Sequence, residues 1–357
     1  MIIGILGMPL TGKTTIFNLL TSQHREVELY SSRKTKNIGV VRVADERVDA
    51  LSLIFQPKKT TYASIEIIDI PGISSDMSGE AKQEIFNQIQ KADALLMVIR
   101  VFNDNTIPGS TEPVYQAESL ICEILIHDLE IVENRITRLN ESKRRLTNQE
   151  EFEKQILTKC QEHLGTDQLL ITLSLSEDEL KILSGFSFFT LKPAILAINI
   201  GENNINDQKF SNHEKFSQFV KEHQMASIPI CGKLEMEINE LSEEEKKIFL
   251  EDMGFEKTGA ERLSHVLYEH LGLISFFTVG KDEVKAWTIK RGTTAIKAAG
   301  KVHSDMERGF IRAEIVDYND FKDLGSMQKV KEKGLFKVEG RDYLIEDGDI
   351  VNFRFNV

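Results

Sequence analysis

Residues 7–14 read GMPLTGKT and match the pattern G-x-x-x-x-G-K-[ST]. Before them, the apolar residues 1–6 predict a buried strand, and after them residues 15–20 predict the start of an amphipathic helix. A glycine-rich loop between strand and helix binds phosphate, because its backbone N–H groups turn inward and the helix N-terminus adds partial positive charge. The pattern therefore predicts a nucleoside triphosphate site, in which Lys13 reaches the β- and γ-phosphates and Thr14 places its hydroxyl on Mg²⁺.

The composition is that of an ordinary globular protein, with 357 residues, 41% of them hydrophobic and 28% charged. This length predicts two to three domains. The sequence shows no basic, apolar leader and no apolar run near the roughly 20 residues that span a bilayer. Its three cysteines, Cys122, Cys160 and Cys231, form neither a disulfide framework nor a metal pattern. We therefore expect a cytoplasmic protein without a membrane partner.

The net charge of −12 is unevenly distributed, because residues 280–357 carry 15 Lys/Arg and 14 Asp/Glu. The preceding part is acidic, which discourages indiscriminate nucleic-acid binding. We expect no DNA partner, and contact with RNA only through a small basic face. Lys297, Lys301, Arg308 and Arg312 are candidates for such a face against RNA phosphate. The alternative is that these four are ordinary solvated surface charges.

Two segments occupy the positions of the switch loops in GTPase-type folds. Residues 24–36 are polar and basic and follow the first predicted helix, and Thr35 is the candidate to complete the Mg²⁺ shell there. Residues 63–72 predict a strand that ends in D-x-x-G. In that motif Asp69 would hold Mg²⁺ through a water, and the Gly72 amide would sense the γ-phosphate.

Further buried strands are predicted at residues 94–101, 192–199 and 227–230, and helical patterns separate them. Strands that alternate with helices predict an α/β fold with a mainly parallel sheet and helices on both faces. Ligands bind such sheets at the carboxyl ends of the strands, where Gly7, Asp69 and Asn199 all fall.

Two other regions have different patterns. Across residues 113–185, apolar side chains recur at three- and four-residue steps, which predicts an inserted helical hairpin; the alternative is ordinary helix packed within the sheet domain. From residue 272 the pattern changes to short strands and turns and ends in a predicted hairpin around Asp347-Gly348. We therefore predict a first domain over residues 1–271 and a small α+β module over residues 272–357.

The segment that would read the base is Asn199–Glu202, with the sequence NIGE. GTPases of this layout carry N-K-x-D here, and the Asp accepts from N1–H and the exocyclic amine of guanine. Glu202 is longer and would crowd that amine, whereas adenine offers its N6 amine as a donor, so the segment favours ATP. Cys231 follows an apolar strand and is expected to pack near the base. The predicted nucleotide-binding residues are Leu10, Thr11, Gly12, Lys13, Thr14, Thr15, Asp69, Gly72, Asn199, Ile200, Glu202 and Cys231, with Thr14 and Thr35 on the metal.

On these motifs the chain resembles the YchF/Obg-like ATPase family, which are Obg-type P-loop proteins. The resemblance covers nearly the whole chain and is carried by residues 7–15, 69–72, 187–193, 199–202, 299–313 and 347–357. It implies a P-loop NTPase domain of the G type, a helical coiled-coil insertion and a C-terminal TGS domain with a β-grasp fold. It also implies ATP hydrolysis with Mg²⁺ and association with ribosomes.

The chain departs from the family's pattern at several positions that bear on hydrolysis. Leu10 stands where the family has Asn, and Arg33 stands nearest to the first-switch Thr. Pro108 falls near the histidine that the family is thought to use in hydrolysis. Ile73 agrees with the family and excludes a water-positioning Gln after D-x-x-G. The chain therefore resembles a divergent member, and no catalytic residue is assigned.

Three functions are consistent with these observations. The first is a slow ATPase whose nucleotide state alters a surface presented to the ribosome or ribosomal RNA. The second is a nucleotide-binding scaffold that does not hydrolyse. The third is a GTPase in which Glu202 substitutes for the usual Asp.

Overall fold

The computed structural model describes residues 1–21, 37–205, 210 and 212–356. They form two compact units, of which the first comprises Met1–Val40 and Glu66–Val266. The second comprises Val41–Ile65 and Leu267–Val357. The predicted first switch and its Thr35 lie outside the described residues.

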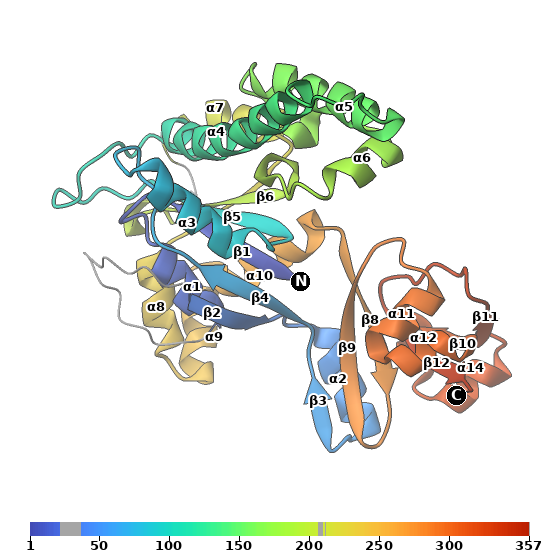
Figure 1. Ribbon diagram of the computed structural model, residues 1–357. Coiled ribbons are helices and arrows are strands. Elements are labelled where there is room, and N and C mark those ends of the chain that lie inside the picture. Colours follow the sequence, from blue (N-terminus) through green and yellow to red (C-terminus); the bar gives the residue numbers. More distant parts are fainter. Residues whose placement is uncertain (22–36, 206–209, 211, 357) are drawn as a thin grey trace. The chain divides into compact units, whose positions relative to one another are not determined.

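The first unit is built around a six-stranded sheet in the order β2-β4-β1-β5-β6-β7 (Figure 1). Its strands are β1 (Ile2–Gly7), β2 (Asn37–Arg42), β4 (Ser64–Asp69), β5 (Ala94–Arg100), β6 (Ala194–Asn199) and β7 (Ala226–Ile230). All the neighbours from β4 to β7 pair in parallel. Every residue of β5 and β6 is buried, as the central strands of a sheet covered on both faces must be. The predicted mainly parallel α/β sheet is confirmed.

Helices connect these strands and cover the sheet. They are α1 (Lys13–Thr21), α3 (Gly79–Ile89), α4 (Pro113–Asn140), α5 (Asn148–Leu164), α6 (Glu177–Leu183), α7 (His213–Glu222), α8 (Gly232–Asn239), α9 (Glu243–Asp252) and α10 (Gly259–His270), with short 3-10 turns η1 (Leu170–Thr172), η2 (Phe189–Leu191) and η3 (Glu202–Asn204). None of the described helices is long and apolar enough to cross a membrane.

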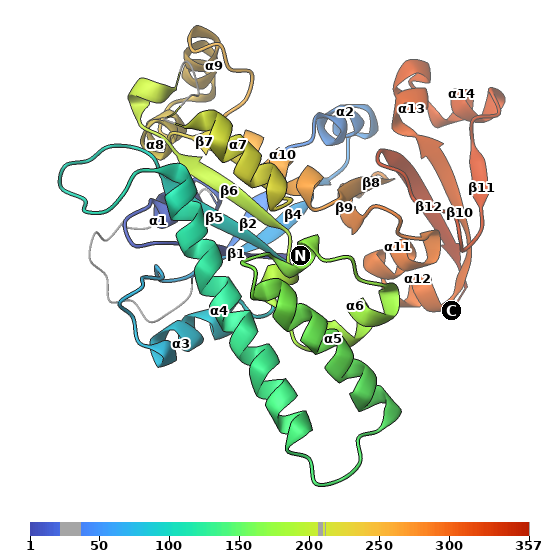
Figure 2. The ribbon, with the colours of Figure 1, turned by 90° about the horizontal axis from the view of Figure 1, so that it is seen from above.

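Helices α4 and α5 run side by side as a hairpin, as Figures 1 and 2 show. Helix α4 begins at Pro113, after Glu112 accepts the N–H of Tyr115, and α5 begins with a capping box between Thr147 and Glu150. Between the two helices, Arg135 holds both carboxylate oxygens of Glu153 at 2.6 and 2.9 Å. The predicted helical insertion therefore has its long helix and its returning partner where the periodicity placed them.

A buried carboxylate fastens α4 to the segment that precedes β6. Asp128 is fully buried and accepts hydrogen bonds from the backbone N–H and the hydroxyl of Thr190, both at 2.7 Å. Its other oxygen lies 3.0 Å from Nδ1 of His127, whose ring contacts Phe86 and Phe189. Since a buried charge is costly unless it is hydrogen-bonded, this arrangement holds the base of the hairpin in one position.

The second unit contains a six-stranded sheet in the order β11-β10-β12-β8-β9-β3. Its elements are α2 (Glu46–Phe55), β3 (Lys59–Thr61), β8 (Leu273–Val279), β9 (Glu283–Lys290), α11 (Ala295–Val302), α12 (Ser304–Arg308), β10 (Phe310–Asp317), α13 (Tyr318–Leu324), α14 (Met327–Glu332), β11 (Lys337–Glu339) and β12 (Asp349–Phe355). Strand β12 pairs in parallel with β8 at the centre, and α11 follows the β8–β9 hairpin. This is the predicted β-grasp arrangement.

The structure differs from the sequence prediction in how the chain is divided. The boundary at 271/272 assigned residues 41–65 to the first domain, whereas they belong to the second unit. The reason is that β3 extends the second sheet by parallel pairing with β9, and α2 packs against β8 and β9 with Val48 and Leu51 fully buried.

The predicted terminal hairpin around Asp347-Gly348 is wrong. Only β12 is a strand there, and residues before the turn form a single bridge, between Leu344 and Thr294. Asp347 instead accepts the backbone N–H of Ser275 at 2.8 Å and pairs with Arg47 at 2.8 Å. The turn is therefore not a hairpin turn. The strand that follows it, β12, lies between β8 and β10 in the sheet.

Candidate nucleotide-binding site

The glycine-rich loop between β1 and α1 is closed by its own side chains. The hydroxyl of Thr11 donates to the carbonyl of Met8 at 3.0 Å, and Nζ of Lys13 donates to the same carbonyl at 2.8 Å. Gly12 has φ +91°, and a Cβ there would lie 2.2 Å from Nδ2 of Asn199. Glycine is therefore required at this position by both backbone conformation and space.

Leu10 also has a left-handed backbone, with φ 62°. A leucine in this conformation costs roughly 1–2 kcal/mol, whereas Asn is tolerated because its short polar side chain hydrogen-bonds locally. The strain lies in the loop that would surround the phosphates, and Leu10 lines the cavity described below.

Burial lowers the pKa of Lys13 to about 8, although the nearby negative charge of Asp69 opposes the shift. The side chain is only 7% exposed. Desolvation of this kind disfavours the ammonium form, and an arriving polyanion would restore it. The buried ammonium of Lys13 would therefore be stabilised by an anionic ligand in this cavity.

The D-x-x-G segment lies directly against this loop. Thr14 donates its hydroxyl to Asp69 at 3.3 Å, which brings two oxygen ligands together at the start of α1. At Gly72, an added Cβ would lie 2.7 Å from the backbone nitrogen of Pro9 and 3.0 Å from Nζ of Lys13. The backbone of the predicted second switch therefore packs directly against the glycine-rich loop.

Asn199 connects the two sides of the site. Its Nδ2 donates to the carbonyl of Thr11 at 3.0 Å, and its Oδ1 accepts the N–H of Gly232 at 3.0 Å. The side chain is buried and both of its ends are used within the protein. Asn199 therefore fixes the loop to the start of α8.

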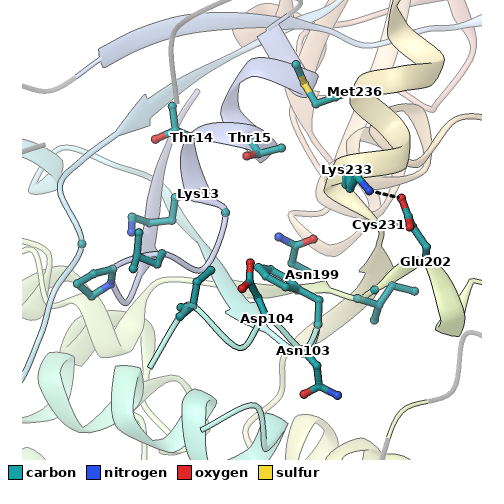
Figure 3. A pocket seen from close by; sticks show the side chains of 18 of the residues that line it. Lys13, Thr14, Thr15, Asn103, Asp104, Asn199, Glu202, Cys231, Lys233 and Met236 are labelled. Atoms are coloured by element: carbon teal, nitrogen blue, oxygen red, sulfur yellow. Dashed lines mark ion pairs between the residues drawn. The ribbon is translucent and has the colours of Figure 1, made fainter. Parts of the chain in front are cut away.

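These residues line a cavity of about 1100 Å³ within the first unit (Figure 3). Eleven of the twelve predicted nucleotide-binding residues are in its wall. The exception is Thr11, whose hydroxyl donates to Met8 within the loop and whose carbonyl accepts from Asn199. Glu202 lies across the cavity from the loop and pairs with Lys233 of α8 at 2.9 Å. Cys231 is buried beside them, and that burial raises the pKa of its thiol, which suits packing and not nucleophilic chemistry.

Several wall residues escaped sequence reasoning, among them Phe102, Asn103, Asp104, Lys233 and Met236. The first three follow the carboxyl end of β5, so the rule that ligands bind at strand ends was a usable signal for them. Arg100 holds the loop that continues from them, by donating to the carbonyls of Ile107, Pro108 and Gly109 at 3.0–3.2 Å. Lys233 follows the carboxyl end of β7 and had the same signal, whereas Met236 lies further along α8 and had none.

The candidate basic face of the second unit is largely neutralised by acidic partners. Lys297 pairs with Glu307 at 2.7 Å, Arg308 pairs with Asp305, and Arg312 lies 3.6 Å from Glu314. This arrangement favours the alternative interpretation, in which these residues are ordinary surface charges.

Comparisons with known proteins agree with the geometry. The sequence matches the YchF-GTPase_C family, described as a protein of unknown function, over residues 273–356. It also matches a family described as 50S ribosome-binding GTPase over residues 2–135. A relative from Bacillus subtilis is 37% identical over 361 residues, which cover 99% of each chain. The chain belongs to the YchF family.

Other members extend the comparison. A relative from Buchnera aphidicola (Acyrthosiphon pisum) is 39% identical over 363 residues, again with 99% of each chain covered. The solved structure of a YchF GTPase from Schizosaccharomyces pombe is 28% identical, with a TM-score of 0.86 over 99% of this chain and 97% of that one. The two bacterial relatives are named ribosome-binding ATPase YchF, so the names within the family differ on the nucleotide.

Proposed function

We propose that this chain binds ATP with Mg²⁺ in the cavity of the first unit, hydrolyses it slowly, and acts as a nucleotide-dependent switch on the ribosome in the cytoplasm. The observation that carries the proposal is the convergence of Lys13, Thr14, Asp69 and Gly72 at one end of a cavity large enough for a nucleotide. The bacterial relatives named as ribosome-binding ATPases support the choice of nucleotide and partner.

Lys13 would bind the β- and γ-phosphates after leaving the Met8 carbonyl, to which it now donates. The backbone N–H groups of the loop and of the first turn of α1 would supply the remaining donors. Because Lys13 is buried, its interaction with phosphate is stronger than that of a solvated lysine.

Thr14 and Asp69 offer a hydroxyl and a carboxylate in contact with each other, and Mg²⁺ prefers such oxygen ligands. Among the described residues there is no cluster of three or more His, Cys, Asp and Glu that could hold a metal by itself. This fits a metal held by one or two side chains together with substrate phosphates. Bound there, Mg²⁺ would neutralise charge on the phosphate oxygens.

We infer slow hydrolysis from two positions that lack a side chain able to orient or activate water, namely Ile73, whose backbone N–H donates to Gly7, and Pro108. Ile73 is 2% exposed and apolar, so it cannot orient water. Pro108 has no polar side chain, and its carbonyl accepts from Arg100 at 3.0 Å. Charge stabilisation by Lys13 remains, and we therefore propose weak turnover.

A calorimetric titration with ATP, GTP and their non-hydrolysable analogues tests the nucleotide. ATP should bind more tightly than GTP, and Lys13→Ala should abolish binding while the matched surface variant Lys247→Ala leaves it unchanged. GTP affinity equal to or above that of ATP would instead identify a GTP-binding protein. Phosphate release over hours distinguishes a slow ATPase from a scaffold that does not hydrolyse.

Co-sedimentation with ribosomes tests the partner. Binding should differ between the ATP-analogue and ADP states and should decline as salt rises, since contacts with RNA phosphate release counterions. Identical pelleting in both nucleotide states would remove the switch from the proposal.

A further inference from the structure

An ion pair between Glu202 of the N-x-x-E segment and Lys233, which belongs to no sequence motif, lies at the end of the cavity opposite the phosphate loop. Nζ of Lys233 is 2.9 Å from Oε1 of Glu202, and the two side chains are 71% and 49% exposed. In Figure 3 this pair lies beyond Asn199 as seen from Lys13. Both residues line the cavity, so a bound nucleotide would reach them.

The pair is held by the same bonds that shape the site. Glu202 opens η3 just after β6, and Lys233 is the second residue of α8, just after β7. The backbone N–H of Ile200 donates to the carbonyl of Ile230 at 2.9 Å, and Asn199 accepts from Gly232 at 3.0 Å. Two adjacent strand ends therefore place a carboxylate and an ammonium next to each other.

A carboxylate alone at this position would favour guanine. The edge of guanine offers two neighbouring donors, N1–H and the N2 amine, and a carboxylate accepts both. The edge of adenine offers one donor, the N6 amine, and beside it N1, an acceptor whose lone pair a carboxylate repels. Glu202 by itself therefore explains little of a preference for ATP.

An ammonium beside the carboxylate changes the pattern that the protein presents. Lys233 supplies donors and no acceptor, and Glu202 supplies acceptors only. Together they form a donor next to an acceptor, which complements N1 and the N6 amine of adenine. Guanine seated in the same way would present its O6 acceptor to Glu202 and its N1–H donor to Lys233, so both contacts would be repulsive.

We propose that Lys233 is a specificity-determining residue, which donates to N1 of adenine while Glu202 accepts from the N6 amine. The proposal rests on the proposed binding of ATP in this cavity. Phe102 and Met236 also line the cavity and offer apolar surface for the faces of the base. Recognition of the base thus depends on a pair, of which the sequence motif contains only one member.

The test measures four affinities by calorimetry. Wild type and Lys233→Met are each titrated with ATP and with 1-deaza-ATP, an analogue that lacks the N1 acceptor. Wild type should bind ATP about five- to tenfold more tightly than 1-deaza-ATP, the size expected for a partly solvated hydrogen bond to a charged group. Lys233→Met should bind the two ligands equally, and its preference for ATP over GTP should shrink. Lys233→Arg keeps a donor and should retain the discrimination.

Lys247→Met is the matched control, because Lys247 is also an exposed lysine in an ion pair, with Glu251, and does not line the cavity. It should behave as wild type. If Lys233→Met still discriminates between ATP and 1-deaza-ATP as wild type does, Lys233 does not read N1 and the inference is overturned. If folded wild-type protein binds no ATP at all, the proposed function itself fails, which is a separate and recognisable result.

Discussion

Nucleotide affinity should depend on pH through Lys13, whose pKa burial lowers to about 8. A triphosphate binds the ammonium form, so the affinity should be constant below this pKa and decline above it. Bound phosphate then holds the proton on Lys13. The perturbation is a change of pH from 7 to 9, a range in which an ordinary lysine stays protonated.

The magnitude follows from the fraction of Lys13 that is protonated. With a pKa of about 8, the apparent Kd should rise about twofold at pH 8 and about tenfold at pH 9, relative to pH 7. A lysine with the ordinary value of 10.5 would weaken binding by only about 3% at pH 9. Terminal phosphates titrate near pH 6 and are fully ionised across most of this range.

The assay is a calorimetric titration with a non-hydrolysable ATP analogue and Mg²⁺ at half-unit steps of pH. Lys13→Arg serves as the control, because its guanidinium stays protonated throughout, and whatever affinity it retains should not change between pH 7.5 and 9. A wild-type affinity that is flat over the same range would refute the argument, because it would mean that Lys13 is not desolvated or does not contact phosphate.

The same shift has a consequence for the stability of the nucleotide-free protein. A lysine whose folded pKa lies below its unfolded value binds fewer protons when folded, so stability rises with pH between about 8 and 10.5 and carries a constant penalty below 8. That penalty is at most about 3 kcal/mol. Lys13→Met should therefore raise the Tm at pH 7 while losing the Tm increase that nucleotide gives wild type.

Two further predictions concern stability. Leu10→Asn should raise the free energy of unfolding by about 1 kcal/mol, because Leu10 has a left-handed backbone that Asn tolerates; unchanged denaturant midpoints would contradict this. Burial raises the pKa of Asp349 to about 6, so the folded state binds its proton more tightly and stability should fall as pH rises from about 4 through 6. Asp349→Asn keeps acceptors for Tyr343 and for the N–H of Glu346, and it should raise stability at pH 7 by about 2 kcal/mol and flatten that pH window, as chemical denaturation would measure.

The phosphate end of the site was predictable because its signals are local. The spacing of glycines, Lys13 and Thr14 between a strand and a helix predicts a loop whose backbone N–H groups surround a phosphate. The D-x-x-G motif ends a neighbouring parallel strand, so its arrival beside the loop follows from the sheet order. Gly12 and Gly72 are glycine for steric reasons that only the structure reveals, namely the closeness of Asn199 and Pro9.

The base end was only partly predictable, because its contacts join residues far apart in sequence. Asn199 reads as a base contact, yet both ends of its side chain are bonded to Thr11 and Gly232. In the sequence Glu202 has no basic residue close to it, but in the structure it forms an ion pair with Lys233, 31 positions later. A motif identifies residues that face a ligand. Whether their side chains are neutralised or already hydrogen-bonded depends on neighbours that the motif does not contain.

The division of the chain shows the same limit on a larger scale. Composition changes near residue 272, and the YchF-GTPase_C match begins at residue 273, so sequence consistently marks that position. The compact unit nevertheless needs residues 41–65, since α2 buries Val48 and Leu51 within it and β3 completes its sheet. Arg47 joins the two segments of the unit through Asp347, which also holds the backbone of Ser275. Residues 41–65 lie in sequence between the predicted first and second switches. They nevertheless belong to the second unit, which contains the C-terminal family match. A truncation at 271/272 would remove most of that unit and leave the apolar face of α2 without the strands it packs against. The contribution of each unit to function is therefore better tested by substitutions within one unit than by truncation.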